Sequence, residues 1–596
     1  MIGGINVKAR ARLSVLLILV FMFAVYAPAN AATSTVADSY PRTQVNFLYH
    51  DYSFRYVSGE PRTINCMIIP VHFTDGYGYD DLFYSQIENT INGGEYYSVR
   101  KYYRYASYGR VELQYEMMPV YDLGMSLLEM QTKLESPENW SWYYELFWQM
   151  YDRTRAAYKG DLSKFDTDND GYADMVIYVF DDPSDDADNI FGSFVSSAYV
   201  TSMDNNRCLY NANHSYPSCA QYVCIEKYMV MQDYFIKTSQ LWEGYGLYFF
   251  QRLNHEIGHL FGIIDYYYYD DLDEYDGHTV LGFDMHDTEK GDLNPWSKMS
   301  VGWIDPYVIT PDIDEVTIKL RCSALYPDCI LIPTSNGWNG TPFDEFILVD
   351  VLGKAGNNKA DWDEVMLFDQ QQGDPPQYGG VRIMHVDQRL CTIDYSANSS
   401  KWFDPSRAFN YDRKGAHPYI ANCMGIGIAA PYSPDPNSEF YFPLHTMTRT
   451  NKTPYFEGRN NSYGWYDFVA SDLFMPGDSF SMESHAAAFA NAPYMNNFGT
   501  FDYEITVTSY NPDTMEALVT VKRINGTPAA AGTLATTRKC TVMQGTYVRQ
   551  SPSASSAAVG YIEYETELEY ISVENGWYLV KLNDGSSGYI YQSRVK

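Results

Sequence analysis

Two histidines four positions apart flank a glutamate in the segment His255-Glu256-Ile257-Gly258-His259. In an α-helix, residues i and i+4 share one face, so both imidazoles can bind one metal ion. Glu256 lies beside them, where a carboxylate can take a proton from a bound water molecule. Zinc suits this set, because it lowers the pKa of its bound water to about 7. The alternative is a helix with two ordinary histidines, but chance produces the full His-Glu-x-x-His pattern in roughly one chain in a hundred.

A third ligand requires the chain to reverse after this helix. Gly262 is the residue type that tolerates the left-handed conformation in which helices often end. A reversal there brings Asp265 back to the metal, so that two histidines, one carboxylate and one water form an open, catalytic zinc site. With a different turn, the third ligand would be one of three later acidic residues: Asp270, Asp271 or Glu274.

The pattern resembles the immune inhibitor A-type metallopeptidase family of the metzincin clan, some of whose members have Asp as the third ligand. The resemblance covers roughly residues 61–523 and implies a zinc endopeptidase that acts on polypeptides, with Met285 in the methionine turn below the zinc. Packing in a core is the alternative role of Met285. The other similar segments are Ser98 to Tyr103, Ala106 to Arg110, Gly282 to Asp287, Pro295 to Met299, Gly302-Trp303, Gly379 to Asp387 and Pro476 to Asp478.

Two features depart from this family. Its members often carry a long inhibitory pro-domain, whereas residues 32–60 form only a short pro-segment or an N-terminal extension here. His278 and His286 lie near the site in sequence, as donors to the substrate or as ordinary loop histidines, and we favour the second interpretation.

The hydrophobic pattern predicts an α+β domain over residues 61–306 that carries the zinc site. Short β-rich runs separated by Gly, Pro and Asn predict a β-sandwich-like domain over residues 307–523. The elements that we expect are strands at 63–73, 111–121, 175–180, 345–351, 381–386 and 505–521, and helices at 98–105 and 247–261. Overall we predict an α+β metzincin-like zinc peptidase domain, then the β-sandwich-like domain, then a small C-terminal β-barrel.

The small β-barrel is expected after a flexible linker at residues 524–539. Residues 540–596 resemble bacterial SH3-like domains in three segments: Thr546 to Pro552, Asn575 to Val580 and Gly588 to Ile590. This resemblance implies binding to cell-wall peptides, with exposed aromatic rings as a stacking surface. Trp577 is a candidate for that surface or for the domain core.

A second metal site is predicted where carboxylates alternate along the chain before a strand. Hard oxygen ligands with this spacing and a glycine for the turn suit Ca²⁺. The twelfth position of the loop, Ile177, is not the glutamate that an EF-hand needs, so we expect a calcium loop outside that fold. An acidic turn is the alternative. The proposed ligands are Asp166, Asp168, Asp170, the Tyr172 carbonyl and Asp174.

The first residues have the order of a secretory signal peptide, namely basic residues, an apolar run over 13–25 and the small triplet Ala29-Asn30-Ala31. We expect cleavage after Ala31 and a secreted, extracellular protein without a transmembrane anchor. A retained membrane anchor is the alternative. The formal charge of −33 in 596 residues opposes binding to phosphate backbones, so we expect no nucleic-acid partner.

The nine cysteines would meet an oxidising compartment. Cys322 and Cys329 are close enough in sequence to close one loop, and Cys208, Cys219 and Cys224 form a second group. No pair has the two-residue spacing of a zinc knuckle, so disulfides or inert thiols are expected instead of metal ligation.

These observations predict a secreted zinc-dependent endopeptidase, in which Glu256 serves as general base and then general acid. Two other functions remain open. A cell-wall peptide hydrolase would use the same zinc on peptidoglycan cross-links, and a calcium-stabilised surface binding protein would not be catalytic. The presence of Glu256 argues against the second, since a binding protein has no need of that carboxylate.

Overall fold

The computed structural model describes most of the chain between residues 40 and 595. The described ranges are 40–45, 62–93, 98–134, 140–167, 173–181, 199–202, 227–232, 245–261, 263, 266, 283–363, 377–394, 399–403, 418–420, 444–449, 470–489, 492–497, 499–524, 538–542, 546–551, 556, 558–562, 566–574, 577–582, 587–591 and 594–595. The predicted signal peptide lies outside them. None of the helices in the described ranges combines the length and the apolar composition of a membrane span.

The first domain is built on a mainly parallel sheet. Its order is β2-β1-β4-β6-β5, in which β5 alone is antiparallel, and β3 continues the pairing along β1. The strands are β1 (Arg62–His72), β2 (Val111–Met117), β3 (Tyr121–Asp122), β4 (Met175–Phe180), β5 (Tyr199–Ser202) and β6 (Lys227–Gln232). Strands buried on both faces are apolar throughout, as β4 is, and this made β1 and β4 recognisable in the sequence.

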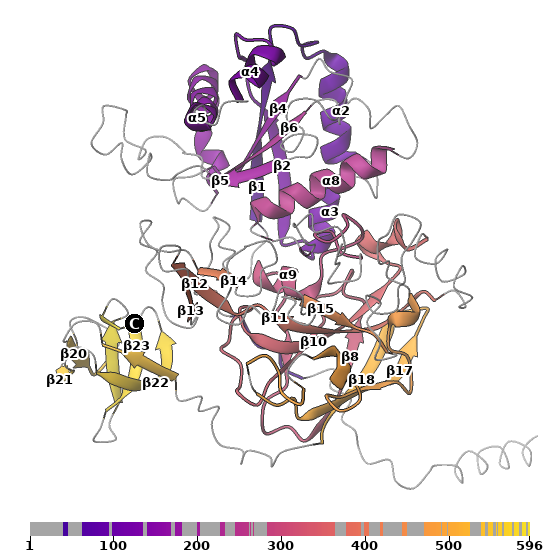
Figure 1. Cartoon of the computed structure of the whole chain (residues 1–596), viewed down its shortest axis with the longest axis vertical. Helices are drawn as coiled ribbons and strands as arrows, with labels where there is room; N and C mark the ends of the chain where they lie inside the picture. The colour runs from indigo at the N-terminus through magenta and orange to yellow at the C-terminus, as the bar shows by residue number, and fades with distance from the viewer. Residues whose placement is uncertain are drawn as a thin grey trace, which may run out of the picture.

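Helices cover both faces of this sheet (Figure 1). Alternate residues of β1 face opposite sides, so Ile68 joins the core under α2, α3 and α8, whereas Ile69 joins the core under α4 and α5. The prediction of an α+β domain therefore needs correction to a three-layer α/β arrangement, because parallel neighbours require helical crossovers. The helices are α2 (Asp81–Asn92), α3 (Val99–Ala106), α4 (Leu127–Leu134), α5 (Trp140–Ala157), η2 (Leu162–Phe165) and α8 (Tyr245–Leu260).

The second domain contains two sheets that pack face to face, as expected of a β-sandwich. One has the order β15-β11-β10-β9-β7 and the other β16-β17-β18-β8, and a shared core includes Val349 from the first and Val519 from the second. A smaller sheet has the order β13-β12-β14. The strands are β7 (Tyr307–Val308), β8 (Glu315–Arg321), β9 (Ile330–Pro333), β10 (Glu345–Gly353), β11 (Gly379–Asp387), β12 (Leu390–Asp394), β13 (Ser399–Phe403), β14 (Pro418–Ile420), β15 (Leu444–Met447), β16 (Ser479–Phe480), β17 (Tyr503–Asn511) and β18 (Glu516–Arg523).

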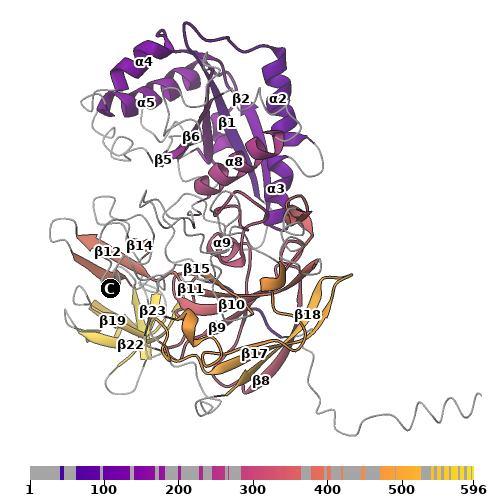
Figure 2. The same ribbon diagram turned by 45° about the vertical axis from the view of Figure 1, so that its right-hand side comes forward.

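One short helix, α9 (Pro295–Ser300), lies between the first and the second domain. Figures 1 and 2 both place α9 between α8 and the sheets of the second domain. Lys298 of α9 is fully buried at this boundary, where it pairs with Asp292 at 2.6 Å and donates to the carbonyl oxygen of Ser323 at 3.1 Å. The second domain also contains η4 (Gly356–Lys359), η5 (Ala470–Asp472) and η6 (Ala486–Ala488).

The C-terminal segment forms a six-stranded sheet of order β19-β22-β23-β24-β20-β21 around its own small core. Among its described residues, no ladder joins the edge strands β19 and β21, so the hydrogen bonds do not close the predicted barrel. Tyr547 is exposed and Trp577 is half-buried against Tyr591, so Trp577 lies at the surface side of this module. The strands are β19 (Arg538–Thr541), β20 (Thr546–Arg549), β21 (Ala558–Ile562), β22 (Glu567–Glu574), β23 (Trp577–Lys581) and β24 (Ser587–Tyr591).

Residues 40–45, within the expected pro-segment, lie against the second domain. The hydroxyl group of Tyr40 donates to the carbonyl oxygen of Val308 at 2.9 Å, and Arg42 forms an ion pair with the buried Asp328. These contacts hold this part of the segment near β7, and Val45 joins the core that includes residues of α9.

Of the two alternatives left open for the cysteines, disulfides or inert thiols, the structure shows the second for Cys322 and Cys329, which are free, buried thiols. Cys322 packs in the core between the two sheets, whereas Cys329 packs in the core that includes α9. The two side chains therefore belong to different cores, and closeness in sequence did not bring them together. Cys66 is also a free, buried thiol.

These three thiols are expected to resist alkylation in the native protein. Burial raises the pKa of Cys322 to about 12 and raises the pKa of Cys66 and Cys329 as well, so little reactive thiolate is present at pH 8. Iodoacetamide treatment with mass-spectrometric mapping, with and without denaturant, measures this protection. Equal labelling in both states, or a peptide pair linked through Cys322 and Cys329, would contradict it.

Candidate metal centre

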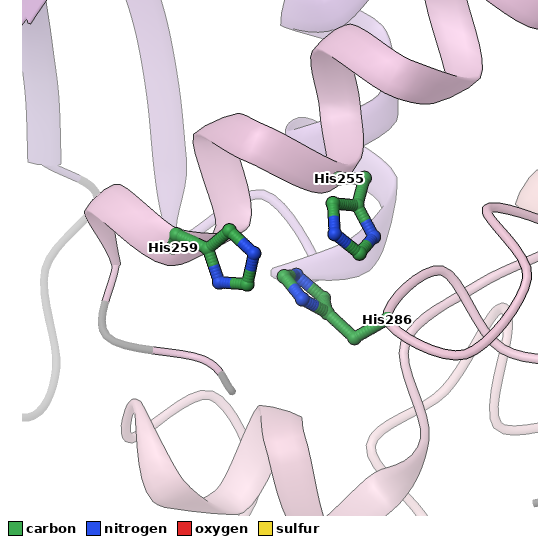
Figure 3. Close-up of side chains that lie close together, drawn as sticks. All are labelled: His255, His259 and His286. Carbon is green, nitrogen blue, oxygen red and sulfur yellow. The ribbon is translucent and has the colours of Figure 1, made fainter. Parts of the chain in front are cut away.

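Helix α8 presents His255 and His259 on one face, as their spacing predicts (Figure 3). The Nδ1 atom of His255 lies 2.8 Å from the carbonyl oxygen of Met285, and the Nδ1 atom of His259 lies 2.8 Å from that of Ile263. A carbonyl oxygen can only accept, so each Nδ1 carries the proton and each Nε2 keeps the lone pair that binds a metal ion.

A third imidazole, that of His286, completes the cluster. One nitrogen atom from each of the three rings lies within 4.8 Å of the others. The ring centres of His255 and His286 are 4.6 Å apart, and those of His259 and His286 are 4.8 Å apart. His255 and His286 are buried while His259 is half-buried, so the cluster opens on the side of His259.

Gly258 makes room for His286. A Cβ atom at position 258 would lie 1.9 Å from the Nε2 atom of His286, a distance that no side chain could accept without displacing the ring. The glycine inside the His-Glu-x-x-His segment therefore has a steric role that its position on a helix alone does not explain.

The segment that carries His286 is held in shape by the buried Asp284. One carboxylate oxygen accepts from the backbone N–H of His286 at 2.8 Å, and the other accepts from the backbone N–H of Asn294 at 2.7 Å. Burial raises the pKa of Asp284 to about 7, although the backbone N–H of His286 and the side-chain amide of Asn294 act in the opposite direction. The carbonyl oxygen of His286 accepts from the backbone N–H of Tyr266 at 2.8 Å.

Glu256 follows His255 on the helix and is 7% exposed. Burial raises the pKa of the Tyr103 hydroxyl, and the charge of the Glu256 carboxylate raises it further, which indicates that the two groups are close. The hydroxyl group of Tyr103 donates a hydrogen bond to the carbonyl oxygen of Asn254 and thereby connects α3 to α8 beside the site. The carboxylate thus lies among fixed neighbours.

This donor set fits zinc. Imidazole nitrogen is a preferred zinc ligand, and catalytic zinc sites use three protein ligands. Carbonyl oxygens that accept from the other ring nitrogen, as those of Met285 and Ile263 do here, are the usual outer partners of metal-binding histidines.

The sequence located much of this cluster but not all of it. His255, His259 and Glu256 lie together, and Met285 is 1% exposed in the core beside α8, with its carbonyl oxygen bonded to His255. The sequence alone favours an ordinary loop role for His286, and its position directly after Met285 is the one signal that points to the site. Gly262, Asp265 and His278 lie outside the described residues, as do the alternative third ligands Asp270, Asp271 and Glu274.

The predicted calcium loop is only partly described. Asp168, Asp170 and Tyr172 lie outside the described residues. The carboxylate of Asp174 accepts from the hydroxyl group of Thr167 at 2.6 Å and pairs with Arg62 at 3.1 Å. Asp174 therefore already has a cationic partner, and calcium binding by this loop, with Asp166 at its start, stays a prediction.

Removal of calcium with zinc retained is expected to lower the melting temperature and to speed autolysis, since ion binding stabilises only the native state. Thermal unfolding and gel analysis before and after a calcium-selective chelator would measure both effects, with magnesium addition as the control. An unchanged melting temperature and autolysis rate would show that the predicted calcium site is wrong.

Comparisons with known proteins identify the C-terminal module. Residues 544–596 match the family model of the bacterial SH3 domain. No curated protein matches the chain. Among solved structures, NlpC2 from Trichomonas vaginalis is 14% identical, with 21% of this chain and 46% of that chain covered and a TM-score of 0.10. NlpC1 from the same organism is 16% identical, with 21% and 44% covered and a TM-score of 0.10. The matches span less than half of those two proteins, and at these TM-scores they carry no argument about the fold.

Proposed function

We propose that this chain is an exported, zinc-dependent hydrolase of peptide bonds. The observation that carries this proposal is the cluster of three imidazoles beside a buried glutamate. Two of the imidazoles stand on the C-terminal part of α8 and the third on a loop, and hydrogen bonds to backbone groups hold both elements in place. His255 and His259 supply two ligands. His286 is the third described side chain within reach, and Asp265 is the alternative third ligand that the sequence spacing predicts.

The residues of the chain then have separate tasks. When bound, zinc supplies a Lewis acid and lowers the pKa of water to about 7. Glu256 accepts a proton from the attacking water and returns it to the leaving amine nitrogen. The carbonyl oxygens of Met285 and Ile263 hold the two helix imidazoles in the tautomer that binds a metal.

A polypeptide is the substrate that we propose, because the first sheet has an edge strand close to the helix of the site. Strand β5 lies at that edge near α8, and among the described strands it pairs with β6 alone. The free backbone groups of an edge strand can bind an extended peptide by strand addition. This supports a polypeptide substrate, and extracellular proteins are the substrates that an exported enzyme would meet.

The bacterial SH3 domain favours a second candidate function. Such a module would hold the enzyme at the cell wall through wall peptides, so peptidoglycan cross-links become possible substrates of the same centre. The exposed Tyr547 and the half-buried Trp577 would offer rings for stacking.

Metal analysis joined to two parallel assays tests these proposals. The purified full-length protein is expected to contain zinc and to hydrolyse casein, to lose activity on chelation and to regain it with zinc. Purified wall sacculi are digested in parallel. Cleavage of casein alone supports the protein substrate, cleavage of sacculi alone supports the wall substrate, and a protein without zinc or activity would contradict both.

A further inference from the structure

A single carboxylate of the second domain joins the two elements that carry the three imidazoles. Asp361 follows η4 and is buried. Its Oδ1 atom accepts from the side-chain amide of Gln251 at 2.7 Å, and its Oδ2 atom accepts from the backbone N–H of Gly291 at 2.8 Å. Gln251 lies one helical turn before His255 on α8, and Gly291 belongs to the segment that carries His286.

The residues just before Asp361 contact the same segment. Asn358 accepts from the backbone N–H of Asp292 at 2.8 Å, and Asn357 donates to the carboxylate of Asp292 at 3.0 Å. The fit is close at Gly291, whose φ is +68° and where a Cβ atom would lie 2.9 Å from the side-chain oxygen of Asn358. The second domain therefore follows the backbone of the 283–294 segment over several residues.

We propose that Asp361 is a positioning residue for the metal centre, through which the second domain sets the distance between α8 and the 283–294 segment. This inference rests on the proposed function. A carboxylate only accepts hydrogen bonds, and its two oxygens here take one bond from each element. Because His255 and His286 stand on these elements, a change in their separation moves the imidazoles relative to each other.

The test compares metal binding by full-length variants. Asp361→Ala removes both acceptors, and we expect zinc affinity to fall by roughly 10–100-fold, as for other outer partners of metal ligands. The visible absorption of bound Co²⁺ should also shift, because it reports ligand geometry. Asp361→Asn should restore affinity and spectrum, since the amide of Gln251 can turn and offer its oxygen to the new amide group.

Two further variants keep the test decisive. Asp363→Ala is the matched control, since Asp363 is exposed and pairs with Lys354, so its affinity and spectrum should equal those of the wild type. Gln251→Leu approaches the same link from α8 and serves if Asp361→Ala does not fold; it should reproduce the shift. Wild-type affinity and spectrum in both Asp361→Ala and Gln251→Leu would overturn the inference and leave the proposed function intact. A wild-type protein that binds neither Zn²⁺ nor Co²⁺ would instead overturn the proposed function, and the inference with it.

Discussion

Glu256→Gln is expected to lower the rate of peptide hydrolysis by at least ~100-fold, the scale of general acid-base catalysis, while zinc content and fold are kept. Glutamine has nearly the same volume as glutamate, so the buried position beside His255 can hold it without a cavity. It cannot accept the proton of the attacking water. Steady-state kinetics on a fluorogenic peptide, with metal analysis of the same sample, would measure the effect.

Glu112→Gln is the matched control. Glu112 is a glutamate on β2 of the same domain, and it pairs with Arg100 and Arg104 of α3 and with no residue of the imidazole cluster. This variant should keep wild-type kcat/KM. If Glu256→Gln turns over substrate within a few-fold of the wild-type rate, Glu256 is not the general base. If the variant loses its zinc, Glu256 has a structural role.

The sequence predicted where individual strands and helices lie along the chain better than it predicted which of them pack together. Continuous apolar runs marked β4 and the part of β1 from Cys66 to Val71, because the positions of a strand that are buried on both faces need apolar side chains. The same runs do not say which strands are adjacent or which helices lie between them. The three-layer arrangement depends on crossovers such as α2 and α3 between β1 and β2, and the α+β prediction missed it.

The residues of the site likewise fall into those that local sequence predicts and those that only tertiary packing brings together. His255 and His259 were found because helix geometry relates residues four apart, a purely local property. His286 and Asp361 reach the site through tertiary packing, from a later segment and from the second domain. In the sequence, only the position after Met285 marks His286, and Asp361 has no local signal of its role. The sequence left open whether Cys322 and Cys329 form a disulfide, because closeness along the chain does not decide which core a side chain enters, and the two side chains pack in different cores.

Loss of the third imidazole should affect the metal centre more than loss of Asp361. In His286→Ala only the two imidazoles of α8 remain from the described cluster, whereas catalytic zinc sites use three protein ligands. We therefore expect zinc affinity to fall by more than ~100-fold, beyond the usual effect of an outer partner. Competition with a chromogenic chelator measures the affinity, and the Co²⁺ spectrum reports the number of ligands.

Asp265→Ala is the informative counterpart, because Asp265 is the third ligand that the helix-and-glycine spacing predicts. If His286 closes the set, Asp265→Ala keeps most of its zinc affinity and its Co²⁺ spectrum, and Gly258→Ala loses affinity because the added methyl group would displace the His286 ring. If Asp265→Ala loses the metal while His286→Ala retains it, the third-ligand role of His286 is wrong. Asp265 would then be the third ligand, and His286, beside the two helix imidazoles, would contact the substrate instead of the metal.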